Sequence, residues 1–229
     1  TKVETTYTPT VTPVVPTAEP KETKDVQGAT QTGKPTFTPG ADEVPMDDDT
    51  PATFEDGSKE KVIPGEGTYT VAPDGTVTFV PEKTFTGTGT GVTVKRVDKN
   101  GTPVTAKYTP TVLPATPTAT PAETTDIQGA LQKGLPQFLG GRVSVDGVQK
   151  IVPIDETKPL ELIDPSTGKV TNEIVVPGEG TYTVYNGVVE FRPEPQFVGK
   201  AKGVTVQRVD VNGTPVSTTY TPNVTPVTP

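Results

Sequence analysis

The octapeptide PGEGTYTV stands at Pro64–Val71 and again at Pro177–Val184, 113 positions further along the chain. In both copies Tyr and Val alternate with Thr, and alternation with a period of two is typical of a strand with one buried face. After the first copy, PDG at Pro73–Gly75 leads into TVTF, so this stretch predicts a β-hairpin. The repetition has two explanations: a chemical site was duplicated, or a building block was duplicated for length.

The similarity between the two halves extends well beyond the octapeptide. GVTVKRVDKNGTPV at Gly91–Val104 matches GVTVQRVDVNGTPV at Gly203–Val216, and YTPTV at Tyr108–Val112 matches YTPNV at Tyr220–Val224. YTPTV also occurs at Tyr7–Val11. Self-similarity at a nearly fixed spacing indicates tandem units. The third YTPTV indicates an internal fragment that opens on the last strand of a preceding copy.

These matches divide the chain into four parts. Residues 1–11 are assigned to the end of a preceding repeat or a linker, 12–112 to a first repeat, 113–224 to a second repeat, and 225–229 to a linker to the next. The second repeat carries additional residues around Arg142–Lys150 and Pro165–Lys169, where we expect loop or hairpin extensions.

The rest of the chain continues the strand pattern. No segment has the 3.6-residue apolar stripe of a helix, and the chain has 44 Thr against 4 Ser, where Thr suits a solvated pleated face. About seven short strands per hundred residues, with Gly and Pro between them, are typical of an immunoglobulin-like sandwich. The prediction is an all-β chain of two tandem immunoglobulin-like β-sandwich domains, joined end to end through Pro-rich, extended segments. The expected core residues are Tyr69, Val71, Val77, Phe79, Val92, Val94 and Tyr108, with Tyr182, Val184, Val189, Phe191, Val204, Val206 and Tyr220 in the second repeat.

The composition excludes several classes of function. The chain has no His, Cys or Trp, so thiol nucleophiles, Ser–His pairs and the usual zinc sites are excluded. Its 28 acidic and 20 basic residues give a formal net charge of −8, which argues against nucleic acid as a partner. The apolar runs are too short to span a membrane. We therefore expect no enzymatic activity, no catalytic, cofactor-binding or metal-binding residues, and no cofactor.

Two turns come nearest to a metal site, DKNGT at Asp98–Thr102 and DVNGT at Asp210–Thr214. A calcium loop needs acids at several fixed positions, whereas each turn offers one Asp and one Asn. An Asx-stabilised hairpin turn is the simpler interpretation, and weak calcium binding is the alternative. The acidic run Asp47–Asp49 is interpreted as a solvated loop. Arg96 and Arg208 are expected to cover a strand face and pair with neighbouring acids.

The shared block, from PGEGTYTV through GVTV to NGTPV and YTP, resembles the fibril repeat of CshA-type streptococcal surface adhesins. QTGKPTFTPG at Gln31–Gly40 is another phrase of that family, and the second copy departs from it with QKGLPQFLGG at Gln132–Gly141. The resemblance implies an extracellular, cell-surface, fibrillar adhesin in which many repeats form a stalk. It also implies a covalent wall anchor in a C-terminal region and a binding region at the N-terminus, both outside this chain. It implies no functional residues within the chain.

The expected partners follow from this resemblance. They are neighbouring repeats of the same chain, with lateral association in fibrils as a further option, while host protein or glycan is bound only by other regions of the parent. The alternative is that the repeats themselves bind a host matrix protein or glycan. Loops of Thr, Asp, Gly and Pro, without Trp, argue against that alternative.

Surface proteins of this kind sometimes contain Lys–Asn isopeptide bonds. Alignment of the two copies places Lys95 opposite Gln207 and Lys107 opposite Thr219. Because no Lys of the aligned blocks occurs in both copies, we expect no internal crosslink. The recurring acids Glu66 and Glu179 are assigned to turns or strand ends.

Overall fold

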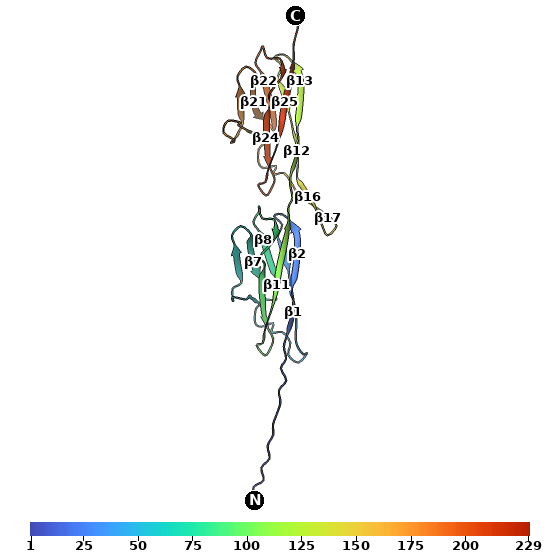
Figure 1. Cartoon of the computed structure of the whole chain (residues 1–229), viewed down its shortest axis with the longest axis vertical. Coiled ribbons are helices and arrows are strands. Elements are labelled where there is room, and N and C mark those ends of the chain that lie inside the picture. Colours follow the sequence, from blue (N-terminus) through green and yellow to red (C-terminus); the bar gives the residue numbers. More distant parts are fainter. The chain divides into compact units, whose positions relative to one another are not determined.

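The computed structural model describes all residues from Thr1 to Pro229 and contains strands but no helix (Figure 1). It therefore offers no helix that is long and apolar enough to cross a membrane. The chain forms two compact units. The first unit comprises Thr1–Asp25 and Ala29–Val112, and the second comprises Val26–Gly28 and Leu113–Pro229.

The first unit is built from two main sheets. Its strands are β1 (Thr17–Glu19), β2 (Lys21–Val26), β3 (Gln31–Gly33), β4 (Thr36–Thr38), β5 (Thr53–Phe54), β6 (Glu60–Ile63), β7 (Gly67–Val71), β8 (Val77–Pro81), β9 (Gly87–Thr88), β10 (Val92–Val97) and β11 (Pro103–Leu113). One sheet has the order β2-β11-β10-β5, with β9 also paired to β11, and the other has the order β3-β8-β7-β6. A separate pair joins β1 to β4.

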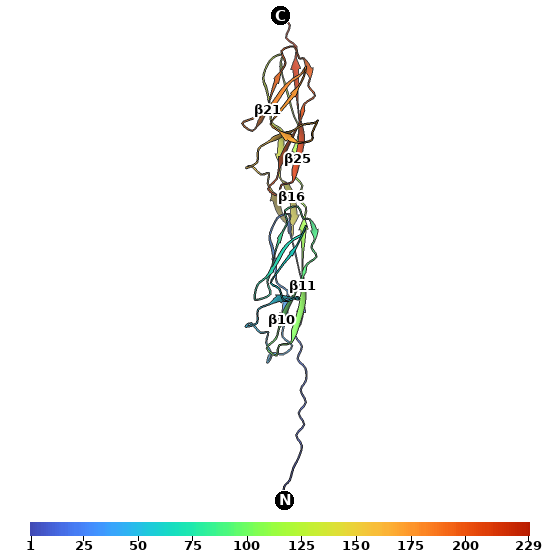
Figure 2. The same cartoon turned by 90° about the vertical axis from the view of Figure 1, so that its left-hand side faces the viewer.

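The second unit has the same arrangement of two main sheets, with additional strands. Its strands are β12 (Thr118–Thr120), β13 (Ala122–Ile127), β14 (Gln132–Gly134), β15 (Gln137–Leu139), β16 (Gly141–Val145), β17 (Val148–Val152), β18 (Glu161–Ile163), β19 (Val170–Thr171), β20 (Glu173–Val176), β21 (Gly180–Tyr185), β22 (Val188–Pro193), β23 (Gly199–Lys200), β24 (Val204–Val209) and β25 (Pro215–Thr225). The two main sheets have the orders β13-β25-β24-β18-β19 and β14-β22-β21-β20. The additional residues form the β16–β17 hairpin, whose first strand is labelled in Figure 2, and the β18–β19 turn. These segments confirm the expected extensions.

Large aromatic side chains fill the space between the two sheets of each unit. Tyr69 and Phe79 stack with ring centroids 4.5 Å apart, and Tyr108 meets Tyr69 edge-on at 6.4 Å. Tyr182 packs on Phe191 at 4.6 Å in the second unit, with the same edge-on partner at 6.4 Å. Both sheets of a unit contribute to one buried cluster. Each unit is therefore a β-sandwich, and the predicted fold class is confirmed.

The predicted core residues are buried, with one difference. Thirteen of the fourteen are buried, whereas Val184 is half-buried and packs against its cluster. Val184 lies one residue before the end of β21, where the sandwich covers it less well. In β11 the burial alternates, with Ala106, Tyr108 and Val112 inside.

Two other expectations differ from the structure. The units contain eleven and fourteen strands rather than about seven, because pairs of two or three residues add to the main strands. No strand forms at Tyr7–Val11, and Tyr7 is exposed. The last strand of a repeat pairs with other strands of the same repeat. That position is occupied by β11 in the first unit and by β25 in the second, so Tyr7–Val11 has no sheet to join.

The first and last strands of the main sheet are neighbours in each unit. In the second unit β13 runs parallel to β25 over six residue pairs, from Ala122↔Tyr220 to Ile127↔Thr225. In the first unit β2 and β11 occupy the same places in the sheet order. This parallel closure, with two facing sheets, is the arrangement of immunoglobulin-like domains.

Candidate functional site

The repeated octapeptide places a carboxylate inside the sandwich. Glu66 is buried, and its Oε2 accepts a hydrogen bond from the hydroxyl of Tyr69 at 2.7 Å. Its Oε1 accepts one from the backbone N–H of Thr90 at 2.6 Å. Gly91 N donates in turn to the Tyr69 hydroxyl at 3.2 Å. Glu66 therefore ties the β6–β7 turn to the start of β10, and every donor in this group has an acceptor.

The two glycines around Glu66 allow this turn. Gly65 has φ +80°, a conformation that glycine adopts at little cost. A Cβ on Gly67 would collide with the backbone oxygen of Val80 and with the ring of Phe79. Pro-Gly-Glu-Gly therefore has a structural role: Gly65 allows the turn, and Gly67 leaves room for the neighbouring strand β8.

The second unit repeats the same network. The Tyr182 hydroxyl donates to Glu179 Oε2 at 3.1 Å, and Lys202 N donates to Glu179 Oε1 at 2.6 Å. Burial, reinforced by the adjacent glutamate, raises the pKa of Tyr69 and of Tyr182 far above the ordinary tyrosine value. Both phenols therefore stay protonated and donate, so neither is a general base at neutral pH.

A second buried network joins three strands of the first unit. Thr23 Oγ1 on β2 donates to Gln31 Oε1 on β3 at 2.7 Å and lies 2.6 Å from the hydroxyl of Tyr108 on β11. Gln31 Nε2 donates to the backbone oxygen of Thr111 at 2.9 Å. A Cβ on Gly33 would approach the Tyr108 ring to 2.6 Å, so this glycine lets the ring pack closely against β3.

The same three side chains meet in the second unit. Thr124 Oγ1 donates to Gln132 Oε1 at 2.6 Å and lies 2.6 Å from the Tyr220 hydroxyl, while Gln132 Nε2 donates to Asn223 O at 3.0 Å. The two tyrosines were predicted as core residues, but their polar partners Thr23, Gln31, Thr124 and Gln132 were not. The signal was present in the recurrence of Gln-x-Gly at Gln31–Gly33 and Gln132–Gly134.

The Asp-x-Asn-Gly turns use their carboxylates locally. Asp98 Oδ1 accepts hydrogen bonds from Asn100 N and Thr102 N, both at 2.9 Å, and Asp210 Oδ1 does the same for Asn212 N and Thr214 N. These are Asx-type turns. The other carboxylate oxygen of each Asp is buried without a hydrogen-bond partner. The chain contains no cluster of three or more acidic side chains that could hold a metal ion.

The two strand arginines pair with acids, as predicted, and these acids lie in the loops before β5 and β18. Arg96 is buried and lies 2.8 Å from the carboxylate of Asp48, and Arg208 lies 3.0 Å from Glu156. Asp47 and Asp49 flank this contact and pair with Lys99 at 3.0 and 3.3 Å. Hydrogen bonds from Thr50 and Lys99 lower the pKa of Asp47. The acidic loop is therefore solvated but anchored.

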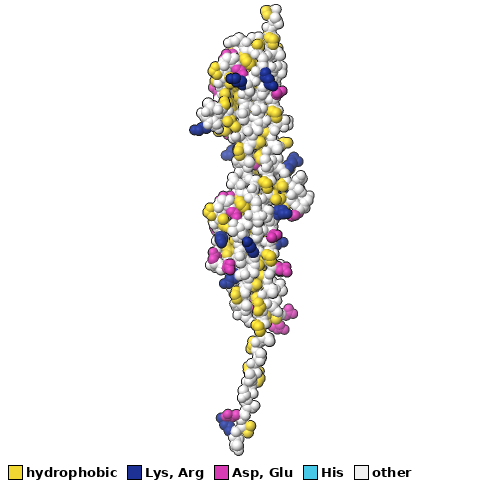
Figure 3. All heavy atoms as spheres, in the orientation of Figure 1, with side chains coloured by type: hydrophobic (Ala, Val, Ile, Leu, Met, Phe, Trp, Pro, Cys, Tyr) yellow, Lys and Arg dark blue, Asp and Glu magenta, His cyan; other side chains and the backbone are white.

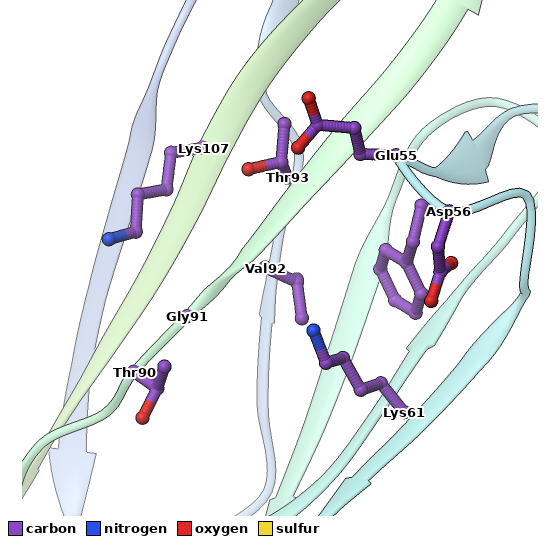
Figure 4. A pocket seen from close by; sticks show the side chains of 9 residues that line it. Glu55, Asp56, Lys61, Thr90, Gly91, Val92, Thr93 and Lys107 are labelled. Atoms are coloured by element: carbon purple, nitrogen blue, oxygen red, sulfur yellow. The ribbon is translucent and has the colours of Figure 1, made fainter.

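A groove of about 380 Å³ lies beside β10 in the first unit (Figure 4). Charged side chains from separate segments surround it: Glu55, Asp56, Lys61 and Lys107. Its lining also includes Thr90, Gly91 and Val92. Two acids and two lysines border the groove, so it carries no single charge.

The second unit has a groove of about 490 Å³ at the corresponding place. Its lining is mainly apolar, with Ile163, Ile174 and Val176, and also includes the charged residues Asp164 and Lys202. The place of Lys61 is taken by Ile174, and that of Lys107 by Thr219. Both units therefore have a groove at this position of the sandwich, but the side chains that line it differ.

Figure 3 shows one face of each unit, over which apolar, acidic and basic side chains are scattered. Exposed apolar residues are present, for example Val62 and Val175 on the edge strands β6 and β20. Scattered apolar side chains of this kind are normal for a soluble surface.

Comparison with known proteins identifies the repeated block. Residues 13–112 and 114–224 match the family described as "Surface adhesin CshA repetitive domain". The NMR structure of repeat domain 13 of the fibrillar adhesin CshA from Streptococcus gordonii is 67% identical, over 31% of this chain and 90% of that chain, with a TM-score of 0.19. No curated protein sequence matches the chain.

Two other solved structures are similar at low identity. EC1-3 of Drosophila N-cadherin is 14% identical over 93% of this chain and 68% of that chain, with a TM-score of 0.30. The N-terminal Ig1-2 module of the Drosophila receptor protein tyrosine phosphatase DLAR is 12% identical over 92% of this chain and 99% of that chain, with a TM-score of 0.26. The two family matches together span nearly all of the 229 residues, so the chain belongs to the CshA repeat family and consists of two tandem repeats of a cell-surface adhesin.

Proposed function

We propose that this chain forms stalk repeats of a bacterial fibrillar surface adhesin and holds an N-terminal binding region of its parent away from the cell wall. The observation that carries the proposal is which features recur in both units. The buried networks around Glu66 and Gln31 recur around Glu179 and Gln132, whereas the linings of the grooves differ. A duplicated ligand site keeps its contacting side chains, while a duplicated building block needs to keep only its interior.

The remaining expectations belong to the same proposal. Residues 12–112 and 113–224 are the two repeats, and the flanking segments connect them to neighbouring repeats of the parent. A C-terminal region outside this chain anchors the parent to the wall, and host protein or glycan is bound elsewhere in the parent. The repeats themselves carry no catalytic, cofactor or nucleic-acid role, and lateral association between fibrils is compatible with this arrangement.

Small-angle X-ray scattering of the 229-residue chain tests the spacer role. A single globule of this length has a radius of gyration of about 17 Å. A spacer made of two domains joined end to end should have a clearly larger radius, with a maximum dimension that does not change with protein concentration. A radius of gyration near the single-globule value would contradict the proposal.

The alternative function is direct binding of a host matrix protein or glycan by the repeats. The observation in its favour is the apolar groove of the second unit, which favours a protein ligand over a glycan. Binding of the chain to immobilised matrix proteins and glycans should be compared with that of Ile174→Asp, with Lys61→Asp at the matching position of the first unit as the control. Saturable binding that only Ile174→Asp abolishes would replace the spacer role, and the absence of saturable binding would support it.

A further inference from the structure

The chain enters and leaves the main sheet of the second unit through adjacent parallel strands. β13 carries the entering chain and β25 the leaving chain, and they pair in parallel over six residue pairs. In a parallel pair, the N-terminal end of one strand and the C-terminal end of the other lie at opposite ends (Figure 1). Tension along the chain therefore pulls the two strands past each other lengthwise. Such a force acts on all rungs of the ladder at once instead of opening them one after another.

Side chains reinforce this strand pair at its buried face. Thr124 on β13 contacts the Tyr220 hydroxyl on β25 at 2.6 Å. Gln132 on β14, in the opposite sheet, accepts from Thr124 at 2.6 Å and donates to Asn223 O on β25 at 3.0 Å. Sliding of β13 along β25 breaks these hydrogen bonds together with the ladder. Because the Tyr220 ring is fully buried, sliding also drags an aromatic ring through the core.

The first unit contains the same side-chain contacts. Thr23 on β2 contacts the Tyr108 hydroxyl on β11, and Gln31 bridges Thr23 to the backbone oxygen of Thr111. β2 and β11 are neighbours in the main sheet. The surroundings of the grooves diverge between the units, but these contacts between terminal strands do not.

We propose that this terminal strand pair, together with its Thr–Gln–Tyr contacts, is a mechanical clamp that gives each unit high resistance to stretching along the chain. The physiological use of such resistance rests on the proposed spacer role, in which drag on a bound head is transmitted through every repeat. The mechanical behaviour itself does not depend on that role. It is a property of strand direction and of the contacts between β13, β14 and β25.

Single-molecule pulling of the whole chain in two directions tests the clamp. With handles at both ends of the chain, each unit unfolds in its own step. The matched segments 13–112 and 114–224 contain 100 and 111 residues. The 11-residue difference adds roughly 40 Å of extended chain to the second step, so each step can be assigned to its unit.

The second direction moves one handle to the turn before β25. Val211 is exposed there, and the chain has no Cys, so Val211→Cys provides a single attachment point. Pulling between the N-terminus and residue 211 loads β13 and β25 from the same end, so their rungs open one at a time. The first unit remains stretched between its own ends in both directions. In the second direction the second unit releases only residues 114–211, which is 98 residues against 100 for the first unit. The steps are therefore assigned there by force, and the step at the first unit's end-to-end force belongs to the first unit.

We expect the second unit to unfold at a clearly lower force in the second direction, while the force for the first unit stays the same. Equal unfolding forces for the second unit in both directions would overturn the clamp. That result would leave the scattering test of the spacer role untouched. Conversely, a compact scattering result would overturn the spacer role and leave the directional measurement valid.

A matched pair of substitutions locates the clamp. Thr124→Val keeps the shape and removes both hydroxyl contacts, and should speed unfolding of the second unit at a fixed end-to-end force by about tenfold. Thr183→Val, on β21 of the opposite sheet, should change this rate by less than about twofold. In the second pulling direction the two variants should unfold alike. Equal acceleration by Thr124→Val in both directions would indicate general destabilisation and overturn the assignment.

Discussion

In the first unit the groove beside β10 is bordered by Lys61 and Lys107, whereas in the second unit Ile174 and Thr219 take these places. The interior behind the groove does not change in this way. The buried carboxylate of Glu66 recurs in Glu179 with the same two kinds of donor, a tyrosine hydroxyl and a backbone N–H. A buried acceptor without its donors costs free energy, while an exposed side chain can change at little cost.

The arginine contacts show an intermediate case. Arg96 pairs with Asp48 and Arg208 with Glu156, so the pairing recurs although the acid and its loop differ. Each arginine lies along the same strand face, and only the partner at the solvent boundary has been exchanged. The two units therefore differ to three degrees. The buried networks are the same, the arginines keep an acidic partner although that partner changes, and the side chains that border the groove differ.

The largest expected effect tests whether the two interiors are energetically equivalent. Phe79→Ala and Phe191→Ala each remove a fully buried ring and should each destabilise their own unit by about 3–5 kcal/mol. Denaturant unfolding of the whole chain, followed by tyrosine fluorescence and circular dichroism, measures the loss. Val62→Ala, at an exposed position of β6, is the control. A loss below about 1 kcal/mol for either ring would mean that the equivalence fails and that its strand register is shifted.

Much of this interior could be predicted from the sequence because strand periodicity reports burial directly. Tyr69, Phe79 and Tyr108 are recognisable as core residues from their alternation with Thr and charged residues. The repeat extensions were recognisable as well, since residues without a counterpart in the first copy must leave the common sandwich.

The buried polar networks could not be predicted in the same way. Glu66 and Gln31 have side chains that are usually exposed, and their partners Thr90 and Thr111 lie far away in the sequence. The alternation of polar and apolar residues does not show which distant backbone N–H group or oxygen forms a hydrogen bond with these side chains. The recurrence of both side chains in the two copies was the available clue, and it was compatible with a turn as well as with a buried contact.

The second prediction concerns the shared carboxylate. Glu66→Ala and Glu179→Ala each leave a buried backbone N–H and a tyrosine hydroxyl without an acceptor. Each should destabilise its unit by about 1–3 kcal/mol. Denaturant midpoints measure the effect, with Glu60→Ala and Glu173→Ala on the exposed edge strands as matched controls. If the two carboxylate variants lose very different amounts of unfolding free energy, the two networks share their geometry but contribute differently to stability.

The third prediction uses the buried tyrosines. Burial raises the pKa of Tyr69, Tyr108, Tyr182 and Tyr220 above the ordinary value of 10.0. Because the pKa is higher in the folded state, the unfolded chain loses its tyrosine protons first as the pH rises. The free energy of unfolding therefore keeps its full value below pH 10 and falls above it by about 1.4 kcal/mol per pH unit for each tyrosine. Thermal midpoints between pH 8 and pH 12 measure this slope in both units. Tyr108→Phe should flatten the slope of the first unit only, and an unchanged slope would contradict the assignment.

The fourth prediction concerns covalent structure, where no change is expected. A threonine hydroxyl meets a side-chain amide in both units: Thr23 Oγ1 lies 2.7 Å from Gln31 Oε1, and Thr124 Oγ1 lies 2.6 Å from Gln132 Oε1. In both, the amide nitrogen donates to a backbone oxygen, and the neighbouring tyrosine has a raised pKa and cannot accept a proton at neutral pH. The intact mass of the chain should therefore equal the sequence mass. A deficit of one ammonia per unit would contradict this and indicate an internal crosslink, either an ester between these Thr–Gln pairs or a Lys–Asn isopeptide bond.

The smallest expected effect is that of calcium, and it tests the turns that looked most like a site. In both units one oxygen of the turn carboxylate is occupied by two backbone N–H groups. The other oxygen is buried, and no further acids gather around it. A calcium ion needs six to eight oxygen ligands, so the turns should not bind it, and calcium or a chelator should leave the thermal midpoints of both units unchanged. A ligand that binds only the folded state raises the midpoint by mass action. A rise with calcium that disappears in Asp98→Asn for the first unit and in Asp210→Asn for the second would establish these turns as metal sites, because Asn preserves the turn acceptor and removes only the charge.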